Sequence, residues 1–170
     1  FGVSKTYADL IVQEYGKNVG LKTVCFRGGC LTGPSHSGAK LHGFLSYLVK
    51  ISLTKKRYSL IGYKGKQVRD NLHSYDLVNS FWEFFKKPTK GEVYNIGGGR
   101  YSNCSIIEAL DLVENISNIE IKREMIKKPR VGDHIWYISN LSKFKNHYPN
   151  WKQKYNTKRI IEELINNFYC

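Results

Sequence analysis

The sequence predicts an α/β fold, because β-rich runs alternate with segments in which apolar residues recur at helical spacing. Apolar side chains follow the helical period over residues 6–19, and the strand-like run Lys22–Phe26 comes directly after a tight turn. The connections are short, without repeats or low-complexity stretches. With 170 residues and an apolar fraction of 41%, the chain is long enough to bury a hydrophobic core.

Glycine and proline mark the element boundaries in the first half of the chain. Gly20 is expected to end the first helix, and the segment Gly28–Ala39 must be a loop because it is rich in glycine, serine and proline. An apolar helix is expected over Leu41–Ile51. Strands are expected over Tyr58–Ile61 and Val68–His73.

Capping residues and turns place the elements of the second half. Asp76 is expected to cap a helix, and Val93–Ile96 is expected to be a strand closed by three glycines. Ser105 and Glu108 fit a capping box that opens a helix to about Ile116. The expected later elements are extended segments over residues 119–125 and 135–138, a short helix from 140, and a final helix over 156–168.

The formal net charge of +13 is compatible with nucleic acid, a membrane surface or a phosphorylated small ligand as partner. The basic residues are scattered without a block of five like charges, so we expect most of them to form a solvated surface. A nucleic-acid-binding module that uses the aromatic and basic residues of 148–155 is the alternative. We expect no nucleic-acid binding, because the basic residues do not cluster, and no membrane binding, since no apolar run approaches the length of a membrane span.

The cysteines predict a reduced, cytoplasmic protein without a structural zinc site. Cys25, Cys30, Cys104 and Cys170 form no CxxC pair, and no histidine lies at zinc-finger spacing. The sequence begins without methionine, so we expect a fragment or a processed product. It shows no signal-peptide pattern.

The first segment with potential chemistry is the opening string FGVSK. Phe1 and Lys5 lie one turn apart on the same face of the predicted helix. A lysine there can hold the hydroxyls of a ribose and lower the pKa of a neighbouring phenol, but Phe1 offers no phenol. The alternative is a surface lysine one turn from a buried phenylalanine.

Three further segments suit a phosphorylated ligand. Residues 26–29 follow a predicted strand, and ligands of open α/β sheets bind beyond such strand ends; the alternative is an ordinary turn. Arg69 and Arg130 are candidate phosphate clamps, with Asp70 able to orient Arg69 and Pro129 able to position Arg130. The alternatives are a surface strand with an ion pair and a plain basic loop.

Taken in order, these segments resemble the extended short-chain dehydrogenase/reductase family in its NAD-dependent epimerase/dehydratase branch. Within that branch, the pattern is similar to that of the CDP-paratose (CDP-tyvelose) 2-epimerases. The matching segments are residues 2–5 with 8–9, 26–27 with 31–34, 65–73 with 76–77, 94–99, and 130–133. The run GKQVRDNLH at 65–73 is the most specific of them. By the same resemblance, the glycines at 97–99 are structural and are not the dinucleotide-binding loop.

The resemblance implies the C-terminal half of a doubly wound, Rossmann-type NAD-binding fold together with a smaller α/β substrate domain. Residues 1–27 and 66–88 would be the last elements of the NAD-binding domain, whose N-terminal part is absent. Residues 28–65 and 89–170 would form the domain that binds a nucleotide-sugar. The full-length protein would be a homodimer, and the isolated fragment would be inactive. Because a half-sheet without its first strands exposes an apolar edge, we expect the fragment to be poorly soluble or to depend on the N-terminal half.

The resemblance also implies an NAD-dependent epimerase or dehydratase that abstracts and returns a hydride on the sugar of a CDP- or UDP-sugar. The implied cofactor-binding residues are Lys5, Phe26, Arg27 and Gly28. The implied residues for the nucleotide-diphosphate sugar are His42, Gly43 and Phe44, with Arg69 and Arg130 on the diphosphate and Asp133 supporting Arg130.

Phe1 departs from the family pattern, in which a tyrosine takes the proton of the sugar hydroxyl. Another group such as His36 or Tyr7 takes this role, or the protein is a non-catalytic relative that binds NAD or a nucleotide-sugar. An engineered tyrosine-to-phenylalanine change is a third interpretation. We favour a natural variant that keeps a sugar-nucleotide role.

Overall fold

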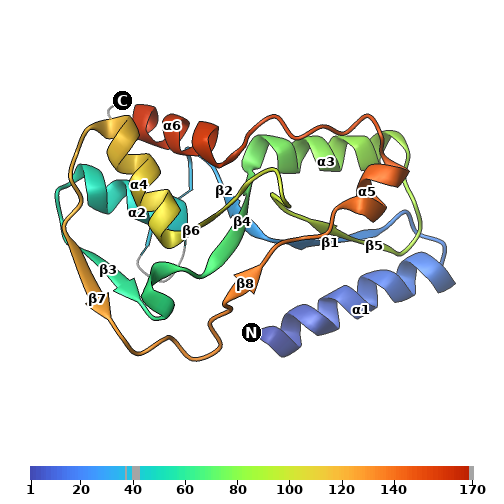
Figure 1. Ribbon diagram of the computed structural model, residues 1–170. Helices are drawn as coiled ribbons and strands as arrows, with labels where there is room; N and C mark the ends of the chain where they lie inside the picture. The colour runs from blue at the N-terminus through green and yellow to red at the C-terminus, as the bar shows by residue number, and fades with distance from the viewer. Residues whose placement is uncertain (37, 40–42, 169–170) are drawn as a thin grey trace.

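The structure is a computed structural model that describes residues 1–36, 38–39 and 43–168 (Figure 1). The helices are α1 (Gly2–Asn18), α2 (Phe44–Leu53), α3 (Ser74–Lys86), α4 (Ile106–Ser117), α5 (Ser142–His147) and α6 (Thr157–Phe168), with a short 3-10 helix η1 (Tyr63–Gly65). The strands are β1 (Val24–Gly28), β2 (Cys30–Thr32), β3 (Tyr58–Ile61), β4 (Val68–His73), β5 (Glu92–Ile96), β6 (Asn103–Ser105), β7 (Arg123–Ile126) and β8 (Trp136–Tyr137).

The strands pair mostly in parallel, which confirms the predicted α/β class. β1 pairs with β5, β3 pairs with β7, and β4 lies between β2 and β6 with β8 also paired to it. Only the β4–β6 pairing is antiparallel among the strands that the structure describes. In Figure 1, α3 and α1 lie on opposite sides of the β1–β5 pair, while α2, α4 and α6 gather at the other end of the molecule.

Two clusters of buried apolar side chains form the core. The first joins α2, α4 and α6 to the strands beside them, and its largest residues include Leu45, Leu48, Leu110, Ile160 and Ile161. The second lies around β5 and α5 and contains Tyr94, Phe144, Tyr148 and Trp151. The predicted boundaries between the two domains stay a prediction, although β5 packs with β1 and α5 in this second cluster.

The predicted helix cap at Asp76 is wrong. α3 begins at Ser74, and the Nδ1 atom of His73 accepts the hydrogen bond from the backbone N–H of Tyr75 at 3.0 Å. The buried Asp76 carboxylate instead accepts hydrogen bonds from the backbone N–H groups of Lys154 and Tyr155 at 2.9 and 3.1 Å. Asp76 therefore fastens the segment that leads into α6. The capping box at Ser105 and Glu108 is confirmed.

Helix α1 packs on β1 and β5 without a side chain at the point of closest approach. A Cβ atom added to the buried Gly16 would collide with the backbone of Gly91 and the hydroxyl of Thr23. That hydroxyl donates a hydrogen bond to the carbonyl of Val12 at 2.9 Å. Only glycine lets the helix come this close to the turn before β5.

A buried carboxylate joins the loops at the carboxyl ends of several strands. Asp70 of β4 accepts hydrogen bonds from the backbone N–H groups of Gly99 and Ser139 at 2.9 and 3.0 Å. Gly29 and Gly97 pack against the same carboxylate, and an added Cβ atom at either position would collide with it. The three glycines after β5 thus have a packing role in this structure.

We expect the substitution Gly98→Ala to destabilise the protein by about 3 kcal/mol, because the new methyl group would collide with backbone oxygens of Ser102 and Asn71. The free energy of unfolding from urea denaturation measures this effect. Gly2→Ala is the matched control, since no atom lies within 4 Å of the position of its added Cβ. Equal midpoints for both variants would contradict this packing.

Among the described residues, no helix is both long and apolar enough to cross a membrane.

Candidate functional site

A cavity of about 220 Å³ collects several of the residues predicted to bind a ligand. Its walls come from β2, β3, β4, the starts of α2 and α4, and the segment before β8. The lining residues are Cys30, Gly43, Phe44, Tyr47, Tyr58, Gln67, Arg69, Ile106, Arg130 and Asp133. Five of the six predicted substrate-binding residues therefore share one cavity, and the sixth, His42, lies outside the described residues.

Arg69 is held in place inside this cavity by an ion pair. Its Nη2 atom lies 2.7 Å from Oδ1 of Asp133, and its Nη1 atom donates to the carbonyl of Val68 at 2.8 Å. The two charged side chains are only 16% and 9% exposed. Both groups are therefore pre-oriented, with part of the guanidinium left to bind a ligand.

This ion pair corrects two predictions about carboxylate partners. Asp133 pairs with Arg69, whereas the sequence predicted that it would support Arg130. Asp70 does not orient Arg69, because neighbouring residues of a strand point to opposite faces and the Asp70 carboxylate binds Gly99 and Ser139.

Arg130 is the second cation of the cavity, and it is exposed. Its side chain has no hydrogen bond or ion pair within the part of the chain that the structure describes. Burial raises the pKa of the neighbouring Tyr58 to about 12, although the positive charge of Arg130 opposes this rise. Tyr58 therefore presents a neutral hydroxyl at neutral pH.

Two buried oxygen atoms of the cavity walls lack hydrogen-bond donors among the described residues. They are Oε1 of Gln67 and Oδ2 of Asp133. The Gln67 amide is fixed because its Nε2 atom donates to the carbonyl of Ile61 at 2.9 Å. Buried acceptors of this kind normally have partners, so the cavity is suited to a ligand that brings hydroxyl or amino groups.

Cys30 adds a neutral thiol to the wall. Burial raises its pKa, and the charge of Arg69 opposes that rise only in part. With two arginines and one aspartate, the cavity keeps a net positive charge. It can therefore bind an anion and, beside it, a group that donates hydrogen bonds.

The predicted cofactor residues lie elsewhere, around the beginning of α1 and the end of β1. Phe1 is 97% exposed, so the alternative interpretation, in which Phe1 is buried, is wrong. The Lys5 ammonium lies 5.5 Å from the centroid of the Phe1 ring. Phe26 packs in the aromatic core against Phe81 and Phe144.

Arg27 connects α1 to the carboxyl end of β1. Its Nε and Nη2 atoms bind the two carboxylate oxygens of Asp9 at 3.0 and 2.8 Å. Lys5 lies one helical turn before Asp9 on α1, and Gly28 follows Arg27 as the last residue of β1. Lys5 and Gly28 thus stand where open α/β sheets bind their ligands.

Several cavity residues escaped the sequence analysis. Gln67 had a detectable signal, because it lies two residues before Arg69 in an extended segment and so shares its face. The other missed residues are Cys30, Tyr47, Tyr58 and Ile106, which reach the cavity from separate elements and have no common spacing in the sequence.

The fold and the cavity define an α/β protein with a cationic pocket for an anion that carries hydrogen-bond donors. Residues 1–97 match the NAD dependent epimerase/dehydratase family. The CDP-paratose 2-epimerase of Salmonella typhi is 26% identical over 171 residues, which covers 96% of this chain and 50% of that protein. The chain spans about half the length of the curated relatives it matches.

Solved structures share the fold. The UDP-glucose 4-epimerase of Thermotoga maritima with UDP-glucose has a TM-score of 0.87 at 21% identity, with 99% of this chain and 53% of that chain covered. The dTDP-glucose 4,6-dehydratase of Bacillus anthracis in complex with NAD has a TM-score of 0.84 at 27% identity, with 98% and 51% covered. The chain belongs to the NAD dependent epimerase/dehydratase family, as its motifs predicted.

The contact between Asp9 and Arg27 makes stability depend on pH. The Arg27 guanidinium lowers the pKa of Asp9 below its ordinary value of 3.8. The ionised carboxylate therefore stabilises the fold above pH 3.8, and this contribution is lost as the pH falls through the lower pKa of the folded state.

We expect Asp9→Asn to cost about 0.5–1 kcal/mol at pH 7, because the partner arginine is largely exposed. Thermal unfolding of both proteins at a series of pH values should show the difference shrinking below pH 3.8. A difference that stays constant down to the lowest pH would show that the charge of Asp9 is not responsible.

Proposed function

We propose that the whole protein to which this chain belongs is an NAD-dependent nucleotide-sugar epimerase or dehydratase. The observation that carries the proposal is the cavity that joins Arg69 and Arg130 to two unpartnered acceptors, in a chain of this family. A nucleotide-sugar suits both features, because its anionic diphosphate can bind the two arginines and the hydroxyl groups of its ribose and sugar can donate hydrogen bonds to the acceptors. CDP- and UDP-sugars are the proposed substrates.

Each arginine would have a different part in holding the diphosphate. Arg69 is nearly buried and is kept rigid by Asp133, so it would fix the position of the phosphate groups. Arg130 is exposed on the segment before β8 and would close over the ligand from the outside. Oδ2 of Asp133 and Oε1 of Gln67 would accept hydrogen bonds from hydroxyl or amino groups of the same ligand.

The residues near β1 fit one side of a dinucleotide site. Of the predicted set, the side chain of Lys5 and the backbone of Gly28 are available to a ligand, whereas Arg27 is engaged by Asp9 and Phe26 is packed in the core. NAD, when bound, supplies a hydride acceptor and donor for the sugar carbon. Lys5 would hold ribose hydroxyls, and the cavity would hold the sugar-nucleotide.

Phe1 leaves the proton-transfer step without its usual phenol. Tyr7 does not replace it directly, because side chains six residues apart on a helix point about 120° away from each other. His36 lies in the turn after β2, and its buried Nδ1 atom has no hydrogen-bond partner in the described ranges. A second candidate function, favoured by Phe1, is a non-catalytic protein that binds NAD or a nucleotide-sugar.

We expect Arg130→Gln to weaken binding of CDP- and UDP-sugars to the full-length protein by about ten- to hundredfold, since a charged hydrogen bond to phosphate is lost. Isothermal titration calorimetry measures the effect. Arg57→Gln is the matched control, because Arg57 is also exposed and does not line the cavity. Unchanged affinity in Arg130→Gln would refute the proposed diphosphate site.

The substitution Phe1→Tyr separates the two candidate functions. If the protein is a disarmed relative, we expect the full-length Phe1→Tyr variant to turn over a CDP- or UDP-sugar at least about 100-fold faster than the wild type, because a general acid–base is restored. Release of NAD on denaturation should be the same for both proteins. A wild-type protein that is already as active as the variant would point to another acid–base group.

The full-length protein is proposed to be a homodimer in the cytoplasm. α1 and α3 expose large apolar side chains, including Tyr7, Leu10, Val78 and Trp82, which favours a covering partner or a further part of the protein. The described cysteines Cys25, Cys30 and Cys104 are free thiols, which suits a reducing compartment.

A further inference from the structure

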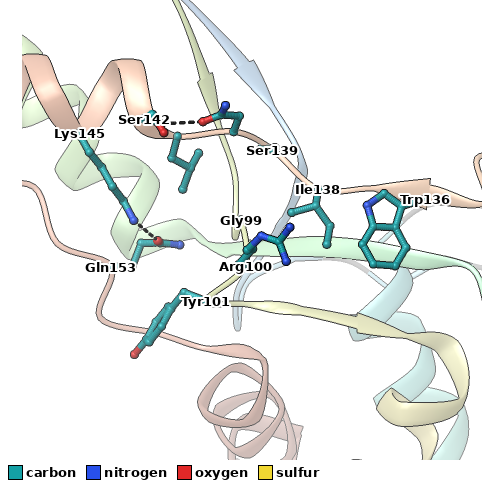
Figure 2. Close-up of a pocket in the computed structure, with 11 residues that line it drawn as sticks. Gly99, Arg100, Tyr101, Trp136, Ile138, Ser139, Ser142, Lys145 and Gln153 are labelled. Carbon is teal, nitrogen blue, oxygen red and sulfur yellow. Dashed lines mark hydrogen bonds between the residues drawn. The ribbon is translucent and has the colours of Figure 1, made fainter.

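A second, larger hollow lies away from the candidate site (Figure 2). Its volume is about 670 Å³, and it is lined by Gly99, Arg100, Tyr101, Trp136, Ile138, Ser139, Asn140, Leu141, Ser142, Lys145 and Gln153. A neighbouring cavity of about 280 Å³ shares Tyr101, Lys145 and Gln153 with it and extends toward Lys152. We call these two cavities together the cationic groove.

The groove and the candidate site lie on opposite faces of the same strands. β8 runs beside β4 with Trp136 opposite Val68 and Tyr137 opposite Arg69. Successive side chains of a strand point to opposite faces, so Arg69 faces the candidate site while Trp136 faces the groove. The two sites share no lining residue among those that the structure describes.

The groove is strongly cationic. Arg100, Lys145 and Lys152 line it, and no aspartate or glutamate does so within the described part of the chain. The Arg100 side chain forms no hydrogen bond or ion pair with any other described residue, and the Lys145 ammonium has only Gln153 Oε1 at 3.2 Å as a hydrogen-bond acceptor. In Figure 2, Arg100 and Lys145 come from the turn after β5 and from α5. These cations are available to an anion of more than one charge.

Exposed aromatic rings lie beside the cations. Trp136 is 63% exposed and Tyr101 is 49% exposed, although both line the groove. Rings of this kind are stacking surfaces for a nucleobase. The groove thus offers the two complements of a nucleotide, a cationic region for phosphate and an aromatic surface for the base.

The floor of the groove is rigid and carries an unsatisfied hydroxyl. The backbone N–H groups of Gly99 and Ser139 donate hydrogen bonds to the Asp70 carboxylate. The Nε2 atom of Gln153 donates a further hydrogen bond to the carbonyl of Gly98 at 2.9 Å. The buried Ser139 Oγ atom has no hydrogen-bond partner in the described ranges. A fixed floor with a free hydroxyl is suited to a polar ligand at little cost in ordering the protein.

We propose that the cationic groove is a binding site for a free nucleoside mono- or diphosphate, separate from the candidate site. The phosphate groups bind Arg100 and Lys145, and the base stacks on Trp136 or Tyr101. The volume of the groove lies in the range usual for small-molecule sites. This proposal does not depend on the proposed enzymatic function, since it rests on other residues and another face.

The test is calorimetric titration of the full-length protein with CDP and UDP. We expect two classes of site in the wild type. The double variant Arg100→Gln/Lys145→Gln should weaken one class by about ten- to hundredfold and leave the other unchanged, because charged hydrogen bonds to phosphate are lost. Arg130→Gln should weaken the class of site that the double variant leaves unchanged. The two variants therefore test binding at the groove and binding at the candidate site separately. Lys158→Gln, outside the groove, is the control and should change neither class.

A fluorescence titration supplies a second readout. The emission of Trp136 should change on binding to the groove, and Trp136→Phe should abolish that change while the double variant shifts it to higher concentrations. A single class of site that the double variant leaves intact would overturn the proposal. If inorganic phosphate binds the groove with the same affinity as CMP, the proposed stacking of the base on Trp136 or Tyr101 is wrong. Tighter binding of a single-stranded oligonucleotide, lost in the double variant, would reassign the groove to nucleic acid.

Discussion

The buried carboxylate of Asp70 is the interaction on which the rest of the structure depends. It accepts hydrogen bonds from Gly99 and Ser139, and it fills the space left by the missing side chains of Gly29 and Gly97. A buried carboxylate needs hydrogen-bond donors, and Oδ2 of Asp70 finds them in the loop after β5 and the chain after β8, so these segments come together here. The relative positions of the candidate site and the cationic groove follow from this meeting point.

One short motif, residues 65–76, organises both faces of the central strands. Arg69 points into the candidate site, Asp70 supports the floor of the groove, and Asp76 fastens the segment before α6. Strand alternation explains how adjacent residues serve opposite faces without interfering. This one segment therefore carries both Arg69, which faces the candidate site, and Asp70, which fixes the loops on the opposite face of the strand.

Local patterns predicted most of the helices and strands, because they depend on neighbours in the sequence. The capping box at Ser105 and the strand Val68–His73 are examples. β2 and β6 were missed, since each has only three residues and is stabilised by pairing with β4, which is distant in the sequence. No local pattern marks such strands.

The candidate site was predictable to a similar extent. Motif resemblance identified Arg69, Arg130 and Asp133, and the structure places all three around one cavity. The pairing of Asp133 with Arg69 could not be predicted, because the two residues are 64 positions apart and the choice between two arginines depends on the path of the chain before β8. The cationic groove had only a partial signal in the sequence. Lys152 and Gln153 belong to the aromatic and basic segment 148–155, whereas Arg100 and Lys145 come from a separate turn and helix.

The contact at Gly16 has a mechanical consequence for the beginning of α1. The helix touches the body of the protein backbone to backbone at Gly16, while Phe1 and Lys5 stand at its exposed end. Lys5 lies eleven residues from this pivot, or about 16 Å along the helix axis. A tilt of about 5° at the pivot would displace Lys5 by about 1.4 Å, enough to matter for the alignment of reacting groups. The close approach at Gly16 and the Asp9–Arg27 contact together set the direction in which α1 carries Lys5.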